Sequence, residues 1–148
     1  MSYGMQRNIH GIYAEADIYG NVGGASPHRL IELLLEGAMS RITLARSFIL
    51  SNRIADKCER ISQAIRIVEG LRLGLDREKG QAIAANLDDL YDYICRQLLV
   101  ANVNNDESIL AEVNALLQQI HSGWVAVRDQ AGSVPAGPIK TGQYAASA

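Results

Sequence analysis

The chain has 148 residues, of which 48% are hydrophobic and only 5% aromatic, and its formal net charge is −2. A chain of this length can bury a core without disulfides or a structural metal, and the predominance of Leu, Ile and Ala favours helices packed on helices over a β-sandwich. Because the net charge is small and negative, neither nucleic acid nor an anionic membrane surface is an expected partner.

The compartment is predicted from the N-terminus and the cysteines. No apolar run of signal-peptide length follows Met1, and no segment approaches the roughly 18 uncharged apolar residues of a membrane span. We therefore expect a cytosolic protein without membrane insertion. Cys58 and Cys95 each fall on an apolar helical stripe. A disulfide or redox pair is one interpretation, but two buried, reduced side chains suit a cytosolic chain better.

Residues 1–25 are predicted to form an N-terminal arm. Their apolar side chains would make one face of a short helix, which a glycine-rich run before Ser26 then breaks. Ser26 and Pro27 start the first long helix, because a serine hydroxyl caps a free N–H and proline at the first helical position loses no hydrogen bond. Apolar residues at intervals of three and four predict this helix over residues 27–51.

The next two helices are predicted to form a hairpin around a charged turn flanked by Gly74 and Gly80. One helix runs from residue 54 to this turn, and the other from about Gly80 to Val103. A short connection makes them antiparallel, and their apolar stripes need further helices to cover them. The inward stripe of the later helix is expected to be Ile83, Leu87, Leu90, Ile94, Leu98 and Ala101.

A fourth helix is predicted from an asparagine cap at Asn105 to about residue 131. Asp106 and Glu107 would lie in its first turn, where the helix dipole favours negative charge. Trp124 falls in its apolar register and is expected in the core.

The predicted fold is all-α, an antiparallel up-down four-helix bundle. Four long helices joined by short connections indicate this topology, and we place the bundle at residues 26–131. The arm at residues 1–25 precedes it. Residues 132–148, rich in glycine and proline with little to bury, are predicted to be a flexible tail.

The residue types that commonly catalyse reactions or bind metals do not have the spacing in this sequence that such sites need. A di-metal bundle requires Glu-x-x-His pairs, but neither His28 nor His121 has a glutamate three residues before it, so both are expected to be solvated. The acidic cluster of the third helix is expected on its solvated outer face and comprises Asp88, Asp89 and Asp92. With no phosphate loop, nucleophile elbow or paired-cysteine motif, we expect no catalytic residue, no metal and no cofactor.

Two tyrosines of the third helix stand out. Tyr91 is expected at the edge of the inward stripe, and Tyr93 is expected to point away from it. An exposed tyrosine beside an apolar edge suits a contact surface, because it buries a large area at small entropic cost. An ordinary half-buried tyrosine fits the pattern equally well.

Five segments, in this order, resemble the family of flagellin-specific export chaperones FliS. They are ASPHRLI at 25–31, EGA at 36–38, GLDREKG at 74–80, IAANL with LYDY within 83–93, and RQLLVAN at 96–102. The resemblance covers about residues 9–128, and the run from Leu75 to Tyr93 is its most specific part. The sequence departs from the family pattern at Gln81, where a second glycine is usual, and at Leu35, where an aromatic residue is usual.

The resemblance implies a chaperone that holds the C-terminal region of newly made flagellin, prevents its premature polymerisation and delivers it to the flagellar type III export apparatus. Other flagellar regulators are further implied partners. A segment that forms coiled coils in the filament needs a substitute apolar partner before export, and grooves between helices supply one. The residues expected to contact flagellin are Ile9, Tyr13, Leu75, Ile83, Tyr91 and Tyr93.

The alternative is a structural bundle whose apolar edges serve only self-association. Whether the free protein is a homodimer is left open by the sequence.

Overall fold

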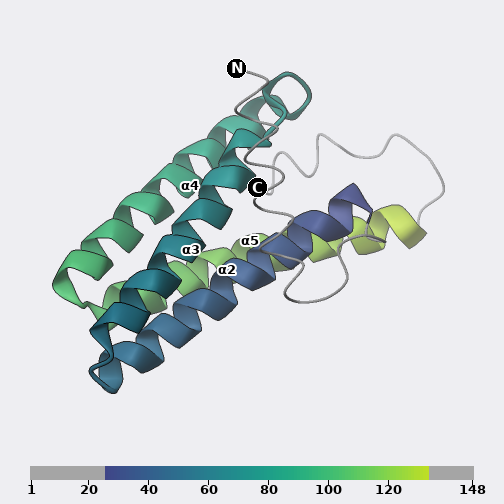
Figure 1. The fold of residues 1–148 in the computed structure, drawn as a ribbon. Helices are drawn as coiled ribbons and strands as arrows, with labels where there is room; N and C mark the ends of the chain where they lie inside the picture. Colours follow the sequence, from purple (N-terminus) through teal and green to yellow (C-terminus); the bar gives the residue numbers. More distant parts are fainter. Residues whose placement is uncertain (1–25, 134–148) are drawn as a thin grey trace.

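The computed structural model describes residues 26–133, with side chains to residue 127. Its helices are α2 (Pro27–Leu50), α3 (Ile54–Leu73), α4 (Arg77–Asn104) and α5 (Glu107–Ser133), as labelled in Figure 1. The described residues contain no strand, and the predicted all-α bundle is confirmed. The predicted arm and nearly all of the predicted tail lie outside the described residues, so the division into arm, bundle and tail stays a prediction.

Each of the four helices packs against two others. α2 contacts α3 and α5, and α4 contacts the same two helices, which is the arrangement of an up-down bundle. In Figure 1 the four helices lie close together at the end that holds the α2–α3 and α4–α5 turns. Toward the other end the α3–α4 pair diverges from the α2–α5 pair. The α3–α4 hairpin turn therefore lies apart from the start of α2.

The start of α2 and the ends of α3 follow the sequence prediction. The Ser26 hydroxyl oxygen accepts a hydrogen bond from the Arg29 N–H at 3.1 Å, and Pro27 occupies the first helical position. α3 ends at Leu73, directly before Gly74. α4 begins at Arg77, about three residues earlier than predicted.

The predicted cap at Asn105 is wrong. Asn105 has φ 51° and ψ 45° and ends α4, a left-handed position that asparagine tolerates better than most residues. The side chain of Asp106 caps α5 instead, because its Oδ1 accepts the N–H groups of Ser108 at 3.0 Å and Ile109 at 3.2 Å. These bonds lower the pKa of Asp106, as does the hydroxyl of Ser108, which has the largest effect.

All four helices contribute to one hydrophobic core. Its buried members are Leu34, Leu35, Ala38, Ile42, Ala45, Ile61, Ala64, Ile67, Val68, Leu71, Tyr91, Ile94, Cys95, Leu98, Ala101, Leu110, Val113 and Leu117. Lys57 is also buried, and its ammonium donates to the main-chain and side-chain oxygens of Asn102 at 2.8 and 2.7 Å. None of the helices in the described part combines the length and hydropathy that crossing a bilayer requires.

The predicted inward stripe of α4 is correct only in the second half of the helix. Ile94, Leu98 and Ala101 are buried as predicted, but the side chains expected before them are half-buried: Ile83, Leu87 and Leu90. Ala84, Tyr91 and Cys95, which were not part of the predicted stripe, are buried. The reason is the divergence of the helix pairs, since α4 packs mainly on α3 toward the hairpin turn.

Both cysteines are free, and only one matches the predicted burial. Cys95 is buried and its Sγ lies 4.0 Å from the main-chain oxygen of Ile65 on α3. Burial raises the pKa of the Cys95 thiol to about 12, so the thiol is protonated at neutral pH. Cys58 is half-buried.

Candidate functional site

The hairpin carries a row of half-buried apolar side chains, which we call the hairpin row: Leu75, Ile83, Leu87 and Leu90. Three of these pack against the edge of the core, and Ile83 is the exception. Asp88 and Cys95 face α3, so the helical period turns the α4 members of the row away from α3. The row therefore lies on the side where the two helix pairs diverge.

The structure separates the two tyrosines that the sequence grouped. Tyr91 is 3% exposed and belongs to the core, so the prediction that it lies at the edge of the stripe is wrong. Burial raises the pKa of its hydroxyl. Tyr93 is half-buried, and its hydroxyl donates to Glu112 of α5 at 3.2 Å. Partial burial and this carboxylate raise the pKa of Tyr93. Ile9 and Tyr13 lie outside the described residues.

A second apolar surface lies on the outer side of α4, and we call it the α4 outer row. Leu99, Val100 and Val103 are 54%, 41% and 81% exposed. Val103 lies three and four residues after Val100 and Leu99, so the three side chains share a face of α4 that is turned away from Leu98. The signal in the sequence was three large aliphatic residues at an outward register. The predicted site residues did not include them.

An ion-pair cluster joins α3 to α4 beside the hairpin turn. Asp88 accepts hydrogen bonds from Arg72 at 2.7 Å and from Arg77 at 2.9 Å, and these two bonds lower its pKa to about 2. Arg72 also reaches Asp92 at 3.2 Å. The expectation of a solvated outer face holds for Asp89, which is exposed, and is wrong for Asp88, which faces α3. Within the described residues no group of three or more His, Cys, Asp or Glu side chains could hold a metal ion.

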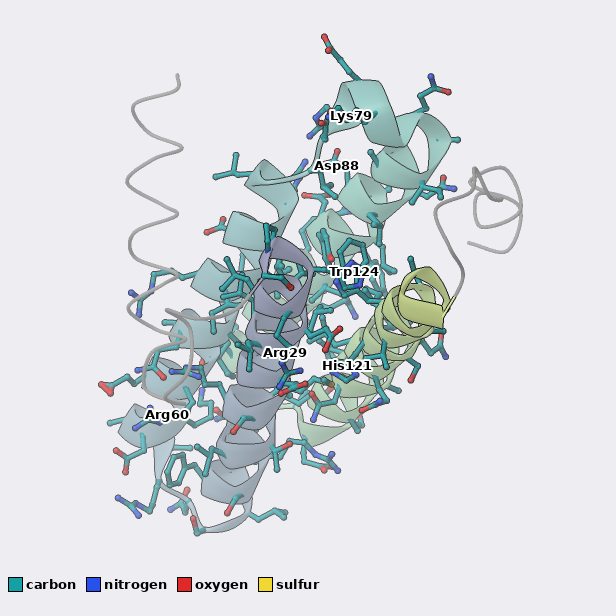
Figure 2. The ribbon with its side chains drawn as sticks, turned by 90° about the vertical axis from the view of Figure 1, so that its right-hand side faces the viewer. Arg29, Arg60, Lys79, Asp88, His121 and Trp124 are labelled. Atoms are coloured by element: carbon teal, nitrogen blue, oxygen red, sulfur yellow. The ribbon has the colours of Figure 1, made fainter. Side chains whose placement is uncertain are left out.

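Both histidines join α2 to α5 and are half-buried, so they are less solvated than predicted. His28 Nε2 lies 2.9 Å from the main-chain oxygen of Trp124, whose indole N–H donates to the main-chain oxygen of His28 at 2.9 Å. His121 Nε2 lies 2.8 Å from a carboxylate oxygen of Glu36. Trp124 is half-buried against the core, and Figure 2 shows it beside His121 on α5.

Comparison with known proteins decides the family. The model of the family described as "Flagellar protein FliS" matches residues 10–131. The chain belongs to the FliS family. The match includes all of the four helices except the last two residues of α5 and takes in Tyr13. It confirms the family expected from the sequence motifs.

Curated FliS relatives match over most of their length. A protein of Salmonella typhimurium named "Flagellar secretion chaperone FliS" is 44% identical over 120 residues, which are 80% of this chain and 89% of the relative. A Pseudomonas aeruginosa protein named "Flagellar secretion chaperone FliSB" is 45% identical over 112 residues, 76% of this chain and 89% of the relative. The Bacillus subtilis FliS is 31% identical over 104 residues, 70% and 77% of the two chains. The predicted function class, a flagellar secretion chaperone, is confirmed.

Proposed function

We propose that the protein binds the C-terminal segment of flagellin in the cytosol, prevents its premature polymerisation and hands it to the flagellar type III export apparatus. The relatives named flagellar secretion chaperones support an export substrate as the partner. The FliS family is a chaperone family, and we propose that the protein acts by binding alone, without catalysis. The family assignment argues against a bundle that only self-associates.

The observation that carries the proposal is the pair of apolar surfaces that the bundle leaves open to water. The hairpin row is half-buried, and the α4 outer row is mostly exposed. Exposed aliphatic side chains that follow a helix suit an amphipathic partner that lays its apolar face along them. Flagellin's C-terminal segment has this character, as the family resemblance implies.

The proposed contact residues include those predicted from the sequence and, in addition, the α4 outer row. Leu75, Ile83 and Tyr93 offer partly exposed surface, and the α4 outer row adds a second apolar surface on the other side of α4. Tyr91 is proposed to act through the packing of α4, since it is buried. Ile9 and Tyr13 remain proposed contacts from the arm.

Calorimetric titration of the full chain with a flagellin C-terminal peptide tests the proposal, together with size-exclusion chromatography of the mixture. We expect saturable binding and a mixed complex that elutes before either component. A peptide of scrambled sequence is the control for non-specific apolar association. If the chain forms only complexes with itself while the peptide elutes alone, the proposed partner is wrong.

A further inference from the structure

The chain folds back on itself at the start of α4. Gln81 has φ 47° and ψ −117°, a combination outside the helical region that side chains rarely adopt. A Cβ on Gly80 would lie 2.8 Å from the Cβ of Ala84, whereas residues four apart in a regular helix keep their Cβ atoms about 5–6 Å apart. These two observations define a sharp kink between Gly80 and Ala84.

An ion pair spans the kink. Arg77 Nη2 lies 2.9 Å from Asp88 Oδ1, although the two residues are eleven positions apart. Eleven residues of straight helix cover about 16 Å, which is beyond the combined reach of these side chains. The pair therefore forms only because the first turn of α4 is folded back. Figure 2 shows Asp88 on α4 close to Lys79 of that turn.

Two effects on the free energy of the kinked conformation oppose each other. The backbone of Gln81 is strained, while the Arg77 side chain is 61% exposed, and an exposed ion pair stabilises a structure only weakly. Residues 77–84 contain no proline and are mostly good helix formers. The same sequence can therefore also form an unbroken helix through Gln81. Strain at Gln81 favours that unbroken helix, whereas the ion pair favours the kink.

We propose that the start of α4 is a two-state element, and that its kinked form is the one that presents the hairpin row to flagellin. In the second state the helix runs unbroken from Arg77 and the Arg77–Asp88 pair is lost. Leu75 lies two residues before Arg77, so straightening the helix moves Leu75 from its place against the core. The role in presenting the row rests on the proposed function, while the two states do not.

Two substitutions shift the element in opposite directions. Gly80→Ala places a Cβ against Ala84 in the kinked form and raises the helix propensity, so it favours the straight form. Gly80→Ala with Ala84→Gly removes that clash and should restore the kink. Gln81→Gly relieves the strain and favours the kinked form.

The readouts are backbone 13C chemical shifts and amide hydrogen exchange of residues 77–84, with peptide titration as the functional measurement. For Gly80→Ala we expect helical shifts at Gln81 and about tenfold weaker peptide binding, both reversed by the added Ala84→Gly change. For Gln81→Gly we expect amide exchange at residues 82–84 about tenfold slower and binding at least as tight as wild type. Asp88→Asn, which removes the pair without adding atoms, should move the shifts of Gln81 in the same direction as Gly80→Ala.

Unchanged shifts at Gln81 in both Gly80→Ala and Asp88→Asn would overturn the two-state element. Helical shifts with unchanged affinity would overturn its role in presenting the hairpin row. If wild type does not bind the peptide, the proposed function fails, and the chemical shifts alone decide whether the two states exist. A thermal melt of each variant distinguishes local straightening from global unfolding.

Discussion

His28 and Trp124 each bond to the other residue's main chain. Both distances are 2.9 Å, and the two rings stack with centroids 4.3 Å apart and an interplanar angle of 19°. Because His28 Nε2 faces a carbonyl oxygen, that nitrogen must carry its proton and donate. This reciprocal contact ties the first turn of α2 to the late part of α5, at the end of the bundle where the helix pairs diverge.

Trp124→Phe should destabilise the bundle by about 1 kcal/mol, because it keeps the stacked ring and removes one hydrogen bond. Trp124→Ala should cost more, about 2–4 kcal/mol, since apolar contact is lost as well. Urea unfolding measures both. In a double-mutant cycle with His28→Ala, the effects should deviate from additivity by about 1 kcal/mol; additivity within about 0.3 kcal/mol would mean that the contact adds no stability.

The Lys57–Asn102 contact predicts an unusual order of stability. Asn102→Ala should cost about 2–4 kcal/mol, because the buried ammonium loses one of its two oxygen partners. Lys57→Met removes the charge and keeps an apolar chain of similar length, so it should cost less. The double variant should therefore be more stable in urea than Asn102→Ala alone. The opposite order would show that the ammonium is not held by Asn102.

Local sequence signals predicted the helix ends better than the buried faces. Ser26 and Pro27 act on adjacent backbone groups, so their effect is independent of the rest of the fold. The predicted cap of α5 was misplaced by one residue, because Asn and Asp both cap helices. Only the left-handed conformation of Asn105 between α4 and α5 distinguishes its role from that of Asp106. Gln81 stands where the family pattern usually has a second glycine, and its φ is positive in the structure, although the sequence did not predict this kink.

Which face of α4 is buried depends on how whole helices are oriented relative to one another. The spacing of apolar residues along the sequence carries no information about that orientation. The stripe predicted through Leu87 and Leu90 assumed that the helices stay equally close along their length. Because the pairs diverge, burial moves toward α3 and takes in Tyr91, while Leu87 stays half-buried. The contacts of His28 with α5 likewise join residues 96 positions apart, for which no local signal exists.

Asp88 predicts a pH dependence with a definite sign. Its pKa falls from an ordinary value of 3.8 to about 2 in the folded protein, so its ion pairs stabilise the fold above about pH 4. That contribution is lost as the pH falls from about 4 to about 2. The difference in free energy of unfolding between wild type and Asp88→Asn should therefore shrink over this range.

Urea unfolding at several pH values measures this difference. Asp89→Asn, at the exposed neighbouring residue, controls for the removal of one carboxylate. A difference between wild type and Asp88→Asn that stays constant from pH 5 to pH 2 would contradict the ion-pair role.

Leu98 and Leu99 form a matched pair of neighbours on α4. Leu98 is fully buried and Leu99 is 54% exposed. Leu98→Ala should lower the free energy of unfolding by about 2–5 kcal/mol, whereas Leu99→Ala should change it by less than about 0.5 kcal/mol. If the α4 outer row contacts flagellin, Leu99→Ala should weaken peptide binding several-fold at unchanged stability. Equal affinities of Leu99→Ala and wild type would remove Leu99 from the contact surface.

Calorimetric titration of the wild-type chain with the C-terminal segment of flagellin is the measurement that tests flagellin binding most directly. We expect saturable binding of defined stoichiometry, and a weakening of about tenfold when Ile83 of the hairpin row is changed to Asp. A thermal melt of Ile83→Asp should stay close to wild type, because Ile83 lies outside the core cluster. No heat of binding from the wild type, with the peptide eluting alone in size-exclusion chromatography, would contradict the claim that this protein is a flagellin chaperone.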